Sequence, residues 1–552
     1  MVLQETYGCV LLSACALLAV LYVLCRRHPS SGSSPGVPSL PLVGCLPFIL
    51  LNKHRLYEWT CEVFDRSASL TIRLTMGSSV FFSTIDPQCI EHILKSKFSS
   101  YPKGPSFYPY FDELLGRGIF NCDGSLWRFQ RKVASHVFTS ASLRDFVVDV
   151  ADTEISNRLL PVLDAAQRSS ESVVDLQALL MDCTFDTTCQ LTFGADPACL
   201  EKNKEKGVPD KTVLCHVPDF VLEGFVQGFQ IALQITAERF LVPQFWWRTK
   251  KYFKIGSEKR LIESLEAVNK FTTYVIEQSK SKREIGKDRR DLLARFLRLS
   301  DALNVAAEGT FVDSNACTVE QEGTSISDSL LRDILLSFIL AGRDTVASGA
   351  TFALWLLCVH PRVETEVLKE IREILKDRQT SAGNTKKIGT FTYEEVKRMN
   401  YLHAVLSEAL RLYPPVPSDC KFADEDDVLP NGTRVAKGSR ISYNVFAMGR
   451  AARVWGNDCL EFRPERWLDE NGLFKPVNPF KYPVFQAGPR TCLGKDFAFI
   501  EMKLLVASLI RDFQFFLQPG FTPKLSYGVS MLMVNGLPLT VKRRSESTTT
   551  FS

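Results

Sequence analysis

The stretch with the clearest chemical potential is FQAGPRTCLG, residues 485–494, which centres on one cysteine. If Cys492 binds a metal ion, it does so as a thiolate, because the deprotonated sulfur is the ligand form of cysteine. Positive charge and converging backbone N–H groups stabilise a thiolate, and Arg490 lies two residues before the cysteine. The segment therefore predicts a metal site with a sulfur ligand.

The other residues of this segment suit a flat ligand. Gly488 and Gly494 let the backbone approach such a ligand closely and take φ values closed to other residues. Phe485 can keep water off the sulfur, and solvent exposure helps to set the potential of an iron site. From Leu493 onward apolar residues recur at helical spacing, so the sulfur should lie just before a helix N-terminus, which favours a negative ligand. The alternative is a Gly/Pro turn that contains one of the 16 cysteines of the chain.

A second candidate for chemistry is AGRDT, residues 341–345, in the middle of a helix predicted over residues 328–359. Its small residues, Ala341 among them, permit close approach by another group. Asp344 and Thr345 add an acid and a hydroxyl, which are the parts of a proton relay. Taken alone, the same residues would also fit a notch for helix packing.

Two further groups stand at helical spacing. Trp127 and Arg131 share a helix face, where a ring N–H and a guanidinium suit an anionic partner. Glu408 and Arg411 lie one turn apart, and Arg466 follows in a later segment. Alone, the first pair fits a surface helix with a half-buried tryptophan, and the second fits a surface ion pair worth only tenths of a kcal/mol.

These four motifs, in this order, resemble those of the cytochrome P450 family, and the resemblance covers essentially the whole chain after its N-terminal apolar run. It implies that Cys492 is the axial thiolate ligand of the iron of haem b. The residues that it places around this cofactor are Trp127, Arg131, Phe485, Gly488, Arg490 and Gly494. It also implies that Asp344 and Thr345 are catalytic, in oxygen activation. The residues that it makes structural are Glu408, Arg411 and Arg466.

The fold class implied is mostly α, a cytochrome P450 fold with a long central helix and a small β-rich region. Alternating apolar residues predict a β-hairpin over residues 69–85. An Asn-Gly turn predicts a second hairpin over residues 529–541. Residues 101–120, rich in aromatic residues, Pro and Gly, predict an irregular loop. Residues 392–412 predict one helix that opens with a capping box.

Composition and the N-terminus indicate where the protein works. A net charge of +4 is too small to favour nucleic acid as a partner. The cysteines are scattered, which fits free thiols in a reducing compartment. An uncharged apolar run ends at Cys25 and is followed by two arginines, which favours an anchor with the rest of the chain in the cytosol. A cleaved signal peptide is the alternative, but its positive start and small-residue cleavage site are missing.

We therefore expect a single-pass protein of the endoplasmic reticulum membrane whose catalytic domain is cytosolic and monomeric. The predicted divisions are a membrane anchor at 1–28, a Pro-rich linker and start of the domain at 29–60, a haem-thiolate catalytic domain at 61–542 and a disordered tail at 543–552.

The sequence has no dinucleotide fingerprint such as GxGxxG, so electrons must come from another protein. The family resemblance implies NADPH-cytochrome P450 reductase, a flavoprotein, as that partner. A basic face of the domain would dock its acidic surface. The candidate residues for this face are Lys132, Lys481, Arg490 and Lys495.

Several phrases, YPKG at 101–104 and LGRGIFN at 115–121 among them, resemble plant family members that oxidise fatty acids at the chain end. Relatives of these enzymes act on jasmonoyl–amino acid conjugates, so a fatty acid or oxylipin hydroxylated at or near the chain end is expected. A carboxylate at the pocket mouth would meet Lys103 or Arg117. The predicted pocket residues are Phe107, Phe111, Ala341, Val416, Met531 and Leu532.

Three alternatives remain open from the sequence. The enzyme could act on another lipophilic plant metabolite. It could be a haem-thiolate isomerase of hydroperoxides that needs no reductase. It could also be a haem-binding sensor without turnover, although that would leave Asp344, Thr345 and the aromatic segment without a role.

Overall fold

The structure is a computed structural model that describes residues 34, 36–40, 43–76, 79–138, 141–168, 173–201, 215–281, 291–294, 298, 327–381 and 390–544. The predicted anchor at 1–28, the start of the linker and nearly all of the predicted tail lie outside the described residues.

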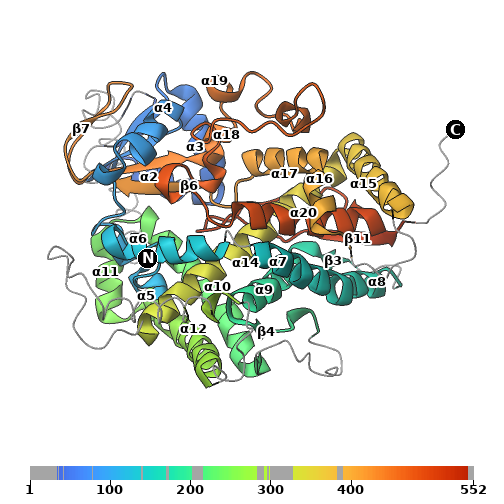
Figure 1. The fold of residues 1–552 in the computed structure, drawn as a ribbon. Coiled ribbons are helices and arrows are strands. Elements are labelled where there is room, and N and C mark those ends of the chain that lie inside the picture. The colour runs from blue at the N-terminus through green and yellow to red at the C-terminus, as the bar shows by residue number, and fades with distance from the viewer. Residues whose placement is uncertain are drawn as a thin grey trace, which may run out of the picture.

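Helices make up most of the described chain (Figure 1). Their bounds are α2 Leu46–Leu51, α3 Leu56–Arg66, α4 Pro87–Glu91, α5 Tyr108–Leu115, α6 Gly124–Phe138, α7 Ala141–Glu154, α8 Leu160–Arg168, α9 Leu176–Phe193, α10 Asp219–Glu238, α11 Gln244–Phe253, α12 Gly256–Ser281, α14 Asp328–Val359, α15 Pro361–Ser381, α16 Tyr393–Arg398, α17 Asn400–Leu412, α18 Val445–Gly449, α19 Ala452–Trp455 and α20 Lys495–Asp512.

The strands are short and form small sheets. Their bounds are β1 Thr71–Met76, β2 Ser79–Thr84, β3 Val174–Asp175, β4 Ala195–Asp196, β5 Cys215–His216, β6 Ser418–Phe422, β7 Asp427–Val428, β8 Arg434–Val435, β9 Arg440–Asn444, β10 Phe513–Leu517 and β11 Pro538–Arg543. The predicted mostly α fold with a long central helix and a small β-rich region is confirmed.

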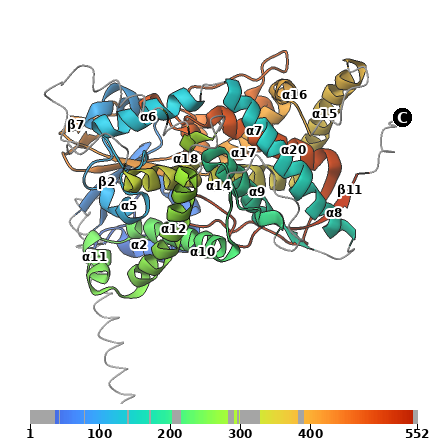
Figure 2. The same ribbon diagram turned by 60° about the horizontal axis from the view of Figure 1, so that its bottom comes forward.

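Helix α14 is the central element, and its bounds match the prediction. It begins where the Ser327 hydroxyl accepts a hydrogen bond from Leu330 N, and it ends before Pro361. Its own buried residues, most of them apolar, lie on every face of the helix, as expected for a helix in the centre of a core. In Figures 1 and 2 it runs through the middle of the molecule, in contact with α9, α12, α17 and α20. It therefore carries its central residues into the interior of the domain.

The β-rich region lies at one side of the molecule with α2, α3 and α18 (Figure 1). Its main sheet has the order β1-β2-β9-β6. The predicted hairpin is confirmed, since β1 and β2 pair antiparallel with Thr71 opposite Thr84. Strand β9 joins β2 in parallel and β6 antiparallel, with Ser418 opposite Asn444. This sheet brings residues 418–422 next to the segment that contains Cys492.

Two expectations about local structure, a loop at 101–120 and one helix at 392–412, were wrong in detail. Residues 101–120 are not wholly irregular, because α5 forms there with Pro109 in its first turn and with buried Phe111 and Leu114. Residues 392–412 form two helices, α16 and α17, although the capping box between Thr392 and Glu395 is present. The break occurs because the Glu370 carboxylate accepts hydrogen bonds from the first backbone N–H groups of α17.

The predicted hairpin at 529–541 was also wrong. Strand β11 pairs with β10 and β3 instead of with residues 529–534. Those residues are fixed by other partners, because Met531 N donates to Pro415 O and Met531 O accepts from the Ser348 hydroxyl of α14. The Asn-Gly turn therefore did not identify the partner of β11. That partner is β10, which is more distant in the sequence.

Candidate active site

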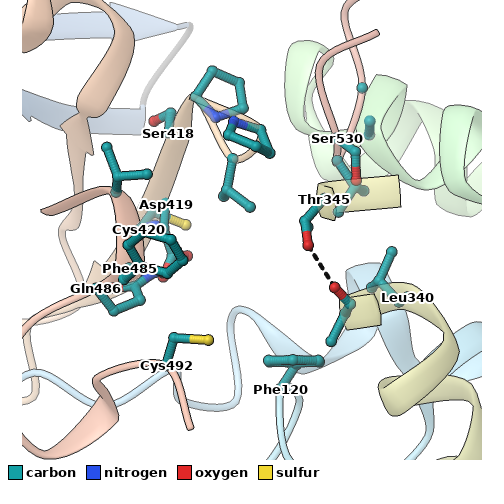
Figure 3. Close-up of a pocket in the computed structure, with 18 of the residues that line it drawn as sticks. Phe120, Leu340, Thr345, Ser418, Asp419, Cys420, Phe485, Gln486, Cys492 and Ser530 are labelled. Carbon is teal, nitrogen blue, oxygen red and sulfur yellow. Dashed lines mark hydrogen bonds between the residues drawn. The ribbon is translucent and has the colours of Figure 1, made fainter. Parts of the chain in front are cut away.

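A cavity of about 590 Å³ lies between α14, the β6–β9 edge of the main sheet and the segment that contains Cys492. Its volume falls in the range of small-molecule sites, roughly 300–1,000 Å³. Apolar side chains from distant parts of the chain form most of its wall. Figure 3 shows Cys492 on one wall and Thr345 on another, with their side chains directed into the same space.

The Cys492 segment is held by its own backbone and by its glycines. Cys492 N donates to Phe485 O at 2.8 Å, which closes the loop immediately before α20 begins at Lys495. Gly488 has a φ of +66°, and a Cβ there would overlap the carbonyl oxygen of Leu94. Among the cysteines that the structure describes, Cys492 is the exposed one, and it lines the cavity. The sulfur is thus directed at the cavity by local geometry.

The charge around Cys492 differs from the sequence expectation. The sulfur is accessible from the cavity but is surrounded by protein, and the resulting loss of solvation raises the pKa of the thiol, while the Gly494 N–H, Arg131 and Lys495 lower it in part. Arg490 does not take this role. Its guanidinium donates to Cys122 O at 3.0 Å and pairs with Asp123. The thiolate therefore needs a bound cation to form readily, because a metal deprotonates a coordinating thiol.

The predicted anion partners do lie together beside the cavity. Arg490 stacks over the Trp127 ring at 4.5 Å, and Trp127, Arg131 and Arg490 all line the cavity. Burial lowers the pKa of Arg131, and the charge of Arg490 adds to this effect. The nearby carboxylate of Asp123 pairs with Arg490. This wall can therefore accept anionic groups of a ligand.

A second charged group on the wall was missed by the sequence reasoning. Lys103, Asp419, Lys421 and Gln486 line the cavity, and Tyr443 OH donates to Asp419 at 2.8 Å. Lys103 is buried and paired with Asp419, so it does not stand free at the mouth as predicted. Burial and the charge of Lys103 lower the pKa of Lys421 to about 7. The available signal was the pair of opposite charges at Asp419 and Lys421, which lie two residues apart and therefore share one face of β6.

On α14 the structure separates the residues of the AGRDT motif. Ala341 and Thr345 line the cavity, and the Thr345 hydroxyl donates to Ala341 O at 2.5 Å (Figure 3). A Cβ at Gly342 would stand 2.6 Å from Thr188 Oγ1, so this glycine also serves as a packing notch for α9. Asp344 is buried outside the cavity lining, 3.5 Å from the Arg343 guanidinium. Burial raises its pKa, and Arg343 lowers it in part.

Four of the six predicted pocket residues line the cavity, namely Phe107, Phe111, Ala341 and Val416. Met531 and Leu532 do not. They are buried in the core, and residues 527–530 form the wall in their place. Met531 is held in the core by the backbone hydrogen bonds to Pro415 and to Ser348 of α14 described above.

Glu408 of α17 is the centre of a buried ion cluster. Its carboxylate accepts from Arg411 Nε at 2.8 Å, Arg466 Nε at 2.9 Å and Trp467 Nε1 at 2.9 Å. Arg411 also donates to Cys459 O at 2.7 Å, which ties α17 to the segment after α19. Burial opposes ionisation, yet the hydrogen bonds and charges of Arg411 and its neighbours leave the Glu408 pKa below its ordinary value.

Comparison with known proteins identifies this arrangement. The family model described as cytochrome P450 matches residues 35–543. This chain belongs to the cytochrome P450 family. Cytochrome P450 94C1 of Arabidopsis thaliana is 41% identical over 494 residues, 89% of this chain and 90% of the relative. Cytochrome P450 94A1 of Vicia sativa is 38% identical over 522 residues, 92% of this chain and 90% of the relative. Cytochrome P450 86B1 of Arabidopsis thaliana is 38% identical over 541 residues, 96% of this chain and 90% of the relative.

This P450 is therefore a monooxygenase, and its family implies haem iron on a cysteine thiolate. The residues present fit that group. The Cys492 sulfur opens into the cavity, and Gly494 lines the same wall without a side chain. Arg131 and Trp127 offer donors for the carboxylates of haem. Among the described residues, no group of three His, Cys, Asp or Glu side chains could hold a metal ion.

No single helix of the described chain combines the length and the apolar character that crossing a bilayer requires. One bent pair, Asp328–Val359 with Pro361–Arg378 at 112°, meets the test only as a pair.

Proposed function

We propose that this P450 hydroxylates a fatty acid, or a fatty-acid-derived oxylipin such as a jasmonoyl–amino acid conjugate, at or near the chain end. The observation that carries the proposal is one apolar cavity that Cys492 and Thr345 both face. Phe107, Phe111 and Val416 add apolar surface at other parts of its wall. An acyl chain matches such a wall, because burying apolar surface is favourable by roughly 25 cal/mol per Å².

Each residue has a separate task in this proposal. When bound, haem supplies the oxygen chemistry, and a thiolate ligand favours O–O cleavage by donating electron density. Cys492 provides that sulfur. Trp127 and Arg131 bind the carboxylates of the cofactor. Thr345 holds a proton at Oγ1, hydrogen-bonded to Ala341 O, where the cavity meets α14.

Selection of the chain end must come from positioning. A methyl C–H bond is stronger than a methylene C–H bond, so chemistry alone favours oxidation further along the chain. The aromatic wall can offset this preference by admitting only the last carbons to the reacting centre, since correct placement lowers the barrier. Asp344 is assigned to the proton supply only indirectly, because its carboxylate lies outside the cavity lining.

The substrate assignment is tested by incubation with reductase, NADPH, medium- and long-chain fatty acids and a jasmonoyl–isoleucine conjugate. Mass spectrometry then locates the new hydroxyl. We expect products hydroxylated at or near the chain end. Turnover of a steroid, terpene or phenylpropanoid, with none of the lipids oxidised, would overturn the lipid assignment. Product formation from a hydroperoxide without NADPH would favour the isomerase alternative.

Electrons are proposed to come from NADPH-cytochrome P450 reductase. Of the four predicted docking residues, Lys132 and Lys495 are exposed. Lys481 is half-buried over the Trp455 ring at 4.5 Å, and Arg490 faces the cavity. The docking face is thus reduced to Lys132 and Lys495. Charge reversal at Lys132 should slow reduction by the reductase and leave reduction by dithionite unchanged, whereas an equal rate with the unaltered protein would exclude this residue from the docking face.

Thr345→Ala should leave the fold and the haem intact but uncouple NADPH consumption from product formation. Without the hydroxyl, protons are no longer supplied at the right place, and the electrons of NADPH leave as hydrogen peroxide. The ratio of product to NADPH consumed should fall by roughly tenfold or more. Thr345→Ser, which keeps a hydroxyl, is the matched control. An unaltered ratio in the alanine variant would remove Thr345 from the relay.

We propose that residues 1–28 anchor the protein in the endoplasmic reticulum membrane. The apolar run there supports this, and so do Phe245 and Trp246 of the described chain, which are 68% and 53% exposed. Deletion of residues 1–28 should move the protein toward the soluble fraction with haem still incorporated. High-salt fractionation separates residual peripheral attachment from anchoring. Tight binding of the truncated protein to membranes, resistant to salt, would contradict the single-anchor proposal.

A further inference from the structure

The turn after α5, residues 116–121, carries two apolar side chains into the cavity. Ile119 and Phe120 both line it. In the view of Figure 3, Phe120 points into the space between Cys492 and Leu340 of α14. The position of this turn therefore decides how much room a substrate has near the reacting centre.

One carboxylate of α14 ties this turn in place. Arg117 N donates to Asp333 Oδ2 at 2.8 Å. The other oxygen, Asp333 Oδ1, accepts from Arg332 Nη1 at 2.7 Å, and Arg332 also donates to Glu113 O at 2.9 Å. Asp333 is buried, and a charged acceptor binds an N–H group more strongly than a neutral one. Asp333 and Arg332 thus bind the turn and the end of α5 to α14 by hydrogen bonds.

The glycines of the turn show how closely it lies on α14. A Cβ at Gly116 would overlap the Asp333 carboxylate, and Gly116 has a φ of +47°. A Cβ at Gly118 would stand 2.7 Å from Asp333 O and would overlap the Ser337 hydroxyl. No side chain fits at either position, so the two glycines permit the contact that Asp333 holds.

The opposite side of the turn is fixed to its own neighbourhood. Gln130 of α6 donates to Arg117 O at 2.8 Å, and Asn121 donates to Gly116 O at 2.8 Å. These bonds shape the turn but do not join it to α14. Asp333 is the side chain that makes this connection through a hydrogen bond to the turn backbone.

We infer that Asp333 is a positioning residue for the monooxygenase reaction. By holding residues 116–121 against α14, it sets where Ile119 and Phe120 stand, and so which carbon of an apolar substrate is presented for oxidation. We call the contact between Asp333 and the backbone of this turn the clamp. The prediction of which carbon is oxidised rests on the proposed lipid substrate, whereas the clamp itself does not.

The clamp is tested first by hydrogen exchange on the haem-loaded full chain. Asp333→Ala should speed exchange of the amide of Arg117 by on the order of tenfold, because its acceptor is gone. Asp333→Asn keeps an acceptor oxygen and should restore most of the protection. Asp328→Ala, an exposed site on the same helix, is the matched control and should leave the turn unchanged. Unchanged exchange in Asp333→Ala would overturn the inference.

The effect on the cavity is tested with two nitrogen ligands of different size, followed by the shift of the haem absorption band. Asp333→Ala should leave the dissociation constant of imidazole unchanged and alter that of phenylimidazole severalfold. With a fatty acid, the hydroxyl should spread over more positions. Faster exchange with identical ligand affinities and identical product positions would also overturn the inference. If no fatty acid is turned over, the lipid proposal fails, and exchange with ligand binding still decides the role of Asp333.

If Asp333→Ala does not fold, Gly118→Ala replaces it. Its Cβ would collide with Asp333 O and the Ser337 hydroxyl and push the turn away from α14. The same changes in amide exchange and in the relative affinities for imidazole and phenylimidazole are therefore expected. Normal exchange and normal phenylimidazole affinity in Gly118→Ala would contradict the clamp.

Discussion

Cys492→Ser is expected to abolish monooxygenase turnover and thiolate ligation of iron. A serine hydroxyl stays neutral where a thiol is deprotonated by a bound metal, so it is a poor iron ligand. Among the described cysteines, Cys492 and Cys420 line the cavity. Cys420 is buried in β6, and burial raises the pKa of its thiol, so it cannot replace Cys492 without rearrangement. Haem-to-protein ratio after gel filtration, with the rate of product formation, measures both effects.

The matched control for this variant is Cys45→Ser. Cys45 is buried away from the cavity, and its sulfur donates to Thr75 O at 3.0 Å, a bond that a serine hydroxyl can also make. It should retain haem and activity. A Cys492→Ser protein that keeps thiolate-ligated haem and turns over substrate would refute the assignment of Cys492.

Glu408→Gln is expected to give the largest loss of stability. It removes the charge that compensates Arg411 and Arg466, both of which donate to this carboxylate in the buried cluster. Breaking a buried pair by removing one partner typically costs about 3–5 kcal/mol. The cluster ties α17 to the segment that precedes the Cys492 loop, so haem retention should fall as well. Thermal unfolding and haem content are the measurements.

Glu465→Gln is the control for this prediction, since Glu465 pairs with Arg362 at the surface, where ion pairs contribute about 0–1 kcal/mol. The Glu408 pKa lies below its ordinary value of 4.5. Its stabilisation is therefore present above that value and lost as pH falls through the lower folded-state pKa. Equal melting temperatures for Glu408→Gln and Glu465→Gln would show that the cluster does not stabilise the fold.

The elements that the sequence predicted best have strong local signals. The periodic apolar residues and the serine cap of α14 locate that helix from Asp328 to Val359. Alternation predicts the β1–β2 hairpin, which the structure has with Thr71 opposite Thr84. In both cases the signal lies within the element itself.

The expectations that failed depend on partners distant in the sequence. Strand β11 pairs with β10 rather than with its predicted neighbour, and Met531 is drawn into the core by α14 and Pro415. The break before α17 depends on Glu370 of another helix. No local pattern contains this information.

In the site, too, local motifs were predicted and contacts between residues distant in the sequence were not. The family resemblance implied that Cys492, Trp127, Arg131 and Thr345 belong to one site, and all four line the cavity. The charged residues Asp419 and Lys421 were missed because their burial depends on how β6 faces the cavity. Lys103, expected at the mouth, is buried because Asp419 neutralises its charge.

The most direct test of the account is the absorption difference spectrum of the reduced, unaltered protein with carbon monoxide. The position of the main haem band reports the ligand on the opposite side of the iron. We predict the band of a thiolate-ligated haem. A band typical of histidine ligation, or purified protein that takes up no haem, would contradict the assignment of Cys492 and the proposed function built on it.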